Sequence, residues 1–195
     1  MATAQMEIRL LEGAELRTAD EGTEKAFSGR LVPYNVWAPI GARWVEQMVP
    51  GVFTRSIQQQ TTRGKSFPLM VNHIHDQLPV GKSVEWDDRP DDGLWGRWVM
   101  ADTDAARECH RMIEEGFLSG LSVGFVPNRE SDRFEPADPP MVNRVTRCQA
   151  RLIEASICSV PTWEEAVVTL TRSTLAPRSD LRPNLEAWSG WRAKL

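Results

Sequence analysis

Short runs of alternating or continuous apolar residues recur along the chain, and their lengths suit β-strands. They lie at residues 6–11, 26–36, 67–73, 93–102, 121–126 and 145–160. Helical spacing appears at residues 51–60 and 104–115. Asp102 or Thr103 can cap the second helix, and Gly116 can end it. Many short strands with two or three helices predict an α+β fold that is mainly β: a closed or nearly closed β-barrel surrounded by a few helices.

Length and charge narrow the class of protein. A chain of 195 residues suits one domain with one core. We divide it into an N-terminal strand with a polar extension (1–26), a central domain (27–172) and a C-terminal tail (173–195). The formal net charge of −4 argues against nucleic acid as a main partner.

The three cysteines favour a reducing compartment. Cys109, Cys148 and Cys158 have no CxxC spacing and fit neither a disulfide framework nor a zinc site. The N-terminus lacks the order of a signal peptide, and no run approaches ~18 apolar residues. We therefore expect a cytoplasmic protein that has no membrane partner. We also expect it to need no metal or organic cofactor.

The segment GFLSGLSVGF, from Gly116 to Phe125, places three glycines around two serines inside an apolar run. Glycine weakens a strand, so it usually marks a bulge or a place where another group approaches closely. By the two-residue period of a strand, Leu121, Val123 and Phe125 share one face. Ser122 then lies on the opposite, glycine-flanked and less apolar face, where its hydroxyl is presented rather than merely buried.

Three polar residues interrupt apolar strand patterns, namely His73, Ser122 and Glu154. A serine hydroxyl becomes a good nucleophile when an imidazole takes its proton and a carboxylate stabilises the imidazolium. The same residues also admit structural roles: a strand-end histidine is commonly a solvated side chain, and a serine between glycines is a common bulge residue. Glu154 can equally pair with Arg147 or Arg151.

Other reactive or charged positions have simpler interpretations. His110 lies in the middle of the second helix and is predicted to be on the surface. Cys109 and Cys158 are predicted to be small core residues rather than nucleophiles. Residues 127–140 are charged and proline-rich, which is typical of an exposed flexible loop.

Six short sequence elements follow one another between Phe27 and Leu170. They are FSGRLVPYNV, VPGVF, LMVNHIHDQLPVG, DGLWGR, IEEGFLSGLSVGF and RLIEASICSVPTWEEA. In this order they resemble the prohead (capsid maturation) proteases of tailed bacteriophages, of the HK97 type. The resemblance implies that residues 27–172 are a serine protease domain, with a fold similar to the herpesvirus assemblin protease, a β-barrel surrounded by helices.

The resemblance also implies roles for single residues. Ser122 matches the serine of the family's S-x-G-F element, which is the nucleophile, whereas Ser119 matches no such position. Glu154 matches the acidic position of a late L-x-E-x-S element and is implied, less firmly, as the third member of a Ser-His-Glu triad.

Two histidines each match part of the pattern expected for the catalytic base. In the family the histidine follows an apolar strand and precedes a Pro-hydrophobic-Gly element, here within LPVG at 78–81. His73 follows Asn72 at the strand end, and His75 precedes Asp76. We prefer His73, because a residue that directly ends the strand has a better fixed backbone, and keep His75 as the alternative base.

The resemblance implies a serine endopeptidase that acts inside an assembling procapsid in the host cytoplasm. Its protein substrates would be the scaffold or the delta region of the major capsid protein, and a homo-oligomer is compatible with the sequence. We also expect the enzyme to cut its own tail between Leu170 and the pair Trp188 and Trp191. The alternatives are a non-catalytic capsid assembly or scaffold-binding module on the same barrel, or a hydrolase of small esters.

Overall fold

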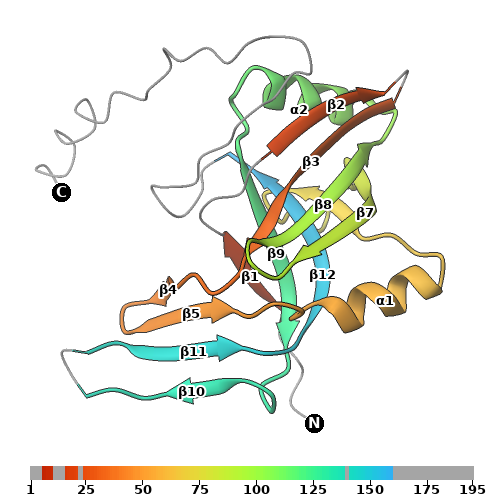
Figure 1. The fold of residues 1–195 in the computed structure, drawn as a ribbon. Helices are drawn as coiled ribbons and strands as arrows, with labels where there is room; N and C mark the ends of the chain where they lie inside the picture. The colour runs from red at the N-terminus through yellow and green to blue at the C-terminus, as the bar shows by residue number, and fades with distance from the viewer. Residues whose placement is uncertain (1–5, 11–15, 22–23, 139–140, 160–195) are drawn as a thin grey trace, which may run out of the picture.

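The computed structural model describes residues 6–10, 16–21, 24–138 and 141–159, which form twelve strands and two α-helices (Figure 1). In chain order the strands are β1 Glu7–Leu10, β2 Leu16–Glu21, β3 Glu24–Pro33, β4 Ala38–Gly41, β5 Trp44–Met48, β6 Pro68–Val71, β7 Gly81–Arg89, β8 Gly93–Met100, β9 Gly120–Pro127, β10 Arg133–Glu135, β11 Asn143–Arg147 and β12 Ala150–Cys158. Helix α1 spans Thr54–Thr62 and helix α2 spans Asp104–Glu114. The predicted C-terminal tail and its two tryptophans lie outside the described residues.

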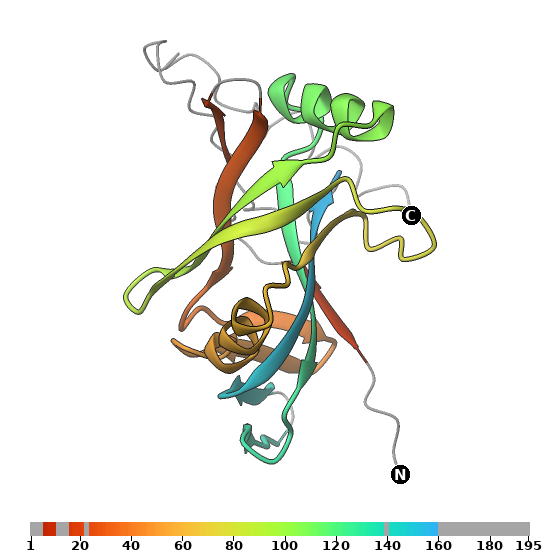
Figure 2. The same ribbon diagram turned by 90° about the vertical axis from the view of Figure 1, so that its right-hand side faces the viewer.

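Eight strands form one strongly curled sheet in the order β1-β9-β12-β6-β7-β8-β3-β2 (Figures 1 and 2). Within it, β12 pairs antiparallel with β9 and parallel with β6. In the part of the chain that the structure describes, β1 and β2 are the two edges and no pairing joins them. The sheet is therefore a half-barrel that stays open. The mainly β prediction is confirmed, and the predicted barrel is confirmed only in part.

Four further strands form a smaller sheet in the order β10-β11-β5-β4, which projects from the curled sheet (Figure 1). The long strand predicted at 145–160 is in fact two strands, because the chain turns at Cys148 and Gln149 and passes from one sheet to the other. The predicted loop at 127–140 is largely exposed, as expected, but it contains β10, which pairs with β11.

A cluster of buried apolar side chains lies between the curled sheet and the helices. Helix α2 lies near one end of this sheet and α1 nearer the other (Figure 2). Thr103 caps α2 by accepting the Ala106 N–H at 3.2 Å, and Gly116 follows its end with φ of +81°. Neither helix is long and apolar enough to span a membrane.

The prediction that His110 lies on the surface is wrong, since only 1% of this residue is exposed. Its neighbours on the inner side of α2 are Ala106, Cys109 and Ile113, which are also buried. These four positions repeat with the i, i+3, i+4, i+7 spacing of one helix face, so a histidine between them is carried into the interior. Cys109 is a core residue, as predicted, and burial raises the pKa of its thiol to about 11.

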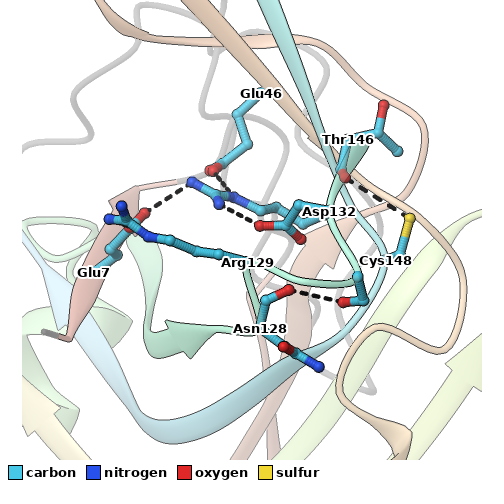
Figure 3. A network of polar contacts seen from close by, with 9 residues as sticks. Glu7, Glu46, Asn128, Arg129, Asp132, Thr146 and Cys148 are labelled. Atoms are coloured by element: carbon cyan, nitrogen blue, oxygen red, sulfur yellow. Dashed lines mark hydrogen bonds and ion pairs between the residues drawn. The ribbon is translucent and has the colours of Figure 1, made fainter. Parts of the chain in front are cut away.

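Arg147, at the end of β11, connects the two sheets through three carboxylates that are labelled in Figure 3. Its Nε donates to Glu46 of β5 at 2.5 Å, and its two Nη atoms donate to Asp132 at 2.6 Å and to Glu7 of β1 at 3.0 Å. Arg129 also lies 3.4 Å from Glu7. Since β1 belongs to the curled sheet and β5 and β11 to the smaller one, this buried network ties the sheets together.

Candidate active site

Strands β9 and β12 place a row of polar side chains on one face of the curled sheet. In their antiparallel register Ser156 lies opposite Ser122, and Glu154 lies opposite Gly124. Ser122, Glu154 and Ser156 are all 0% exposed. The residues of β9 that alternate with Ser122 and Gly124 enter the hydrophobic core, as the period of a strand predicts: Leu121, Val123 and Phe125.

A β-bulge at Ile153 decides which face Glu154 occupies. The pairing passes from Leu152 opposite Phe125 to Glu154 opposite Gly124, so β12 carries one extra residue there. Simple alternation predicts that Leu152 and Glu154 share a face, and this is wrong. Because of the bulge, Leu152 lies in the hydrophobic core while Glu154 joins the polar row.

His73 lies two residues beyond the end of β6, in a left-handed turn formed with Asn72. The φ angles of Asn72 and His73 are +51° and +57°, a region that few residues other than glycine and asparagine adopt without cost. The Asn72 N–H donates to the carbonyl of Ile157 at 2.9 Å, and the His73 N–H donates to the hydroxyl of Ser156 at 3.1 Å. His73 is therefore held by β12, and not only by its own strand as the sequence suggests.

The imidazole of His73 bridges Ser122 and Glu154. Its Nε2 lies 2.5 Å from Ser122 Oγ, and its Nδ1 lies 2.6 Å from Glu154 Oε1. An ionised carboxylate accepts a hydrogen bond from Nδ1–H, and the unprotonated Nε2 can then accept a proton from the serine. The structure thus brings together the three residues that sequence analysis selects, in the order that activates a hydroxyl.

Gly124 leaves the space that the carboxylate of Glu154 occupies. A Cβ atom built on Gly124 would lie 2.1 Å from Glu154 Oε1, far inside van der Waals contact. One of the glycines in the GFLSGLSVGF segment is therefore explained by close approach of a side chain from the neighbouring strand.

The alternative base, the arginines that could pair with Glu154 and the second serine all lie apart from this polar row. His75 is exposed, and so is Arg151, while Arg147 is engaged by the carboxylates described above. Among the described residues, the ion pair of Glu154 is with His73 and none is with an arginine. Ser119 precedes β9 and is half-buried.

Cys158 ends the same polar row and is a buried residue, as predicted, with 3% exposure. Burial, together with the nearby charge of Glu154, raises the pKa of its thiol to about 12. A thiol is nucleophilic only as the thiolate, so Cys158 stays protonated and unreactive at neutral pH. In this row, the hydroxyl of Ser122 contacts the imidazole of His73.

A serine, a histidine and a carboxylate joined in this way form the arrangement by which serine hydrolases activate a hydroxyl. The chain belongs to the family of caudovirus prohead serine proteases, whose model matches residues 12–180. Its activity class is therefore that of a serine protease of phage capsid maturation.

A solved structure supports the fold. The chain is similar to the bacteriophage T4 capsid assembly protease, gp21, with a TM-score of 0.56 and 9% sequence identity, over 79% of this chain and 97% of that one. Among curated proteins, no sequence matches the chain significantly.

Proposed function

We propose that the chain is a serine endopeptidase of the assembling procapsid in the host cytoplasm, with the scaffold or the delta region of the major capsid protein as its substrate. The observation that carries this proposal is the contact of His73 with Ser122 Oγ at 2.5 Å and with Glu154 at 2.6 Å. The family supports proteolysis and the capsid setting, while the substrate and the site residues are parts of the proposal.

In the proposed reaction, Ser122 Oγ attacks the peptide carbonyl and its proton passes to Nε2 of His73. The imidazolium is stabilised by the Glu154 carboxylate at Nδ1. His73 then gives the proton to the leaving amine, which departs and leaves an acyl-enzyme on Ser122. Water attacks the ester with the same imidazole as base, which releases the acid and restores the serine.

The proposed function is tested by labelling the purified chain with a fluorophosphonate and by co-expressing it with the scaffold and capsid protein of its phage. We expect a single adduct on Ser122 and cleavage products of the capsid protein or scaffold in mass spectra. Intact-mass measurement of the enzyme tests self-cleavage at the same time. An adduct without cleavage of any peptide would favour a hydrolase of small esters, and neither adduct nor cleavage would favour a non-catalytic assembly module.

Gly124→Ala is expected to lower the rate of peptide cleavage by at least about 100-fold, because the new methyl group displaces the Glu154 carboxylate from His73. The overpacking should also cost about 1–3 kcal/mol of stability. Gly41→Ala is the matched control, since a Cβ on Gly41 meets nothing within 4 Å. Cleavage rates and thermal unfolding of both variants test this. Wild-type cleavage by Gly124→Ala would contradict the role given to Glu154.

A further inference from the structure

We infer that Ser156 is a positioning residue of the site, whose single hydroxyl orients both the carboxylate of Glu154 and the backbone of His73. This inference rests on the proposed function of Ser122, His73 and Glu154. Ser156 is 0% exposed and lies opposite Ser122 in the register of β9 and β12. It contacts two members of the proposed triad, His73 and Glu154.

The direction of both hydrogen bonds of Ser156 follows from the atoms involved. The backbone N–H of His73 can only donate, so Ser156 Oγ accepts from it at 3.1 Å. The one hydroxyl proton is then left for Glu154 Oε2, which lies 2.7 Å away. The two contacts support each other, because accepting one hydrogen bond strengthens the hydroxyl as a donor in the other.

The first effect of Ser156 is on the carboxylate. The terminal torsion of a glutamate is broad, so a buried carboxylate held at one oxygen can still rotate. With Oε2 fixed by Ser156, Oε1 is held toward His73 Nδ1 at 2.6 Å. Ser156 thereby selects the carboxylate orientation that the imidazole needs.

The second effect is on the backbone that carries the imidazole. His73 has a φ of +57°, which costs energy and persists only where surrounding contacts enforce it. Three contacts with the end of β12 and the residue that follows it hold this turn. They are Asn72 N–H to Ile157 carbonyl at 2.9 Å, His73 N–H to Ser156 hydroxyl at 3.1 Å, and Ser159 N–H to the Asn72 side-chain oxygen at 3.3 Å. Ser156 supplies the side-chain contact to His73 itself.

Ser83→Ala is the matched control for Ser156→Ala. Ser83 lies in β7, is 3% exposed, and its hydroxyl accepts the N–H of Phe67 at 2.9 Å. Both variants therefore lose one buried serine hydroxyl that accepts a backbone N–H in the curled sheet. The two serines differ in that Ser156 contacts His73 and Glu154, whereas Ser83 contacts Phe67.

The test compares steady-state cleavage of a capsid-derived peptide with the proton NMR signal of His73 Nδ1–H, which is identified by its loss in His73→Ala. We expect Ser156→Ala to lower kcat about 100-fold with KM nearly unchanged, and to remove or shift the signal. Ser83→Ala should keep kcat and signal while losing similar thermal stability. Equal kcat in the two variants, with the signal kept in Ser156→Ala, would overturn the inference.

Ser156→Cys covers the case in which the alanine variant does not fold. A thiol is larger than a hydroxyl and is a weak donor and acceptor, so this variant leaves no cavity but loses the orientation. A folded Ser156→Cys chain with wild-type kcat and signal would count against positioning. If the wild-type chain neither cleaves peptides nor takes up a fluorophosphonate, the proposed function fails, while the NMR signal still reports whether Ser156 orders the His73 and Glu154 pair.

Discussion

Replacing Ser122 with alanine is expected to reduce cleavage of the capsid protein by about four to six orders of magnitude, since the variant lacks the attacking oxygen. The fold should remain, because the change removes one oxygen from a strand whose opposite face keeps all its core contacts. Thermal unfolding and cleavage are measured on the same samples. Ser119→Ala is the control, since Ser119 precedes β9 and lies outside the hydrogen-bonded row.

The two histidines provide a second, internal comparison for the same mechanism. His73→Ala should be nearly as inactive as Ser122→Ala, because removing either member disables the same proton transfer. His75→Ala should cleave at close to the wild-type rate, since His75 is exposed. An inactive His75→Ala beside an active His73→Ala would show that the alternative base is the true one. If Ser122→Ala cleaves the capsid protein and Ser119→Ala does not, the nucleophile is Ser119 and not Ser122.

Replacing Arg147 with methionine is expected to destabilise the protein by about 3–5 kcal/mol, because the carboxylates around it lose their buried counter-charge. Arg147 is 5% exposed, and the side chain of Asp132 is 0% exposed. Urea or thermal unfolding measures the loss. Arg111→Met is the matched control: Arg111 also contacts two carboxylates, Glu108 and Glu115, but on the exposed surface of α2, where such pairs contribute about 0–1 kcal/mol.

The loss in Arg147→Met should depend on pH. Burial already raises the pKa of Asp132 above its ordinary value, and Arg147 opposes that rise. A carboxyl with a raised pKa in the folded state binds its proton more readily there than when unfolded, so it favours folding at low pH and opposes it as pH increases. Without Arg147 the pKa of Asp132 in the folded state rises further. We therefore expect Arg147→Met to lose more unfolding free energy at pH 8 than at pH 5. A loss that is equal at both pH values would contradict this account of the network.

Local periodicity predicts much of the sheet but not the pairing between its strands. The alternation in β9 places Ser122 away from the core, and the structure agrees. Strand β7 has the sequence GKSVEWDDR, with too few apolar residues to be recognised from periodicity, and its existence depends on pairing with β6 and β8. The bulge at Ile153 likewise reflects the pairing of β12 with β9, so no pattern within β12 predicts it.

The candidate site could be predicted in its residue types and not in its geometry. His73, Ser122 and Glu154 stand out because each interrupts an apolar pattern, and the structure brings them together. Ser156 shares a strand face with Glu154, and alternation from Glu154 could have found it, but its two hydrogen bonds depend on the neighbouring strands. The left-handed turn of Asn72 is also imposed by contacts with β12, which are distant in sequence.

The position of β12 between β9 and β6 has a consequence for when activity can arise during protein synthesis. The strands that lead to His73 and Ser122 are made well before residues 150–158, which form β12. Until β12 inserts between them, Glu154 is not in place, and nothing joins the turn at His73 to the strand of Ser122. With the proposed triad, a chain whose residues 150–158 have not yet been synthesised and folded has no assembled site, so at that stage it cannot cut capsid proteins or other nascent chains.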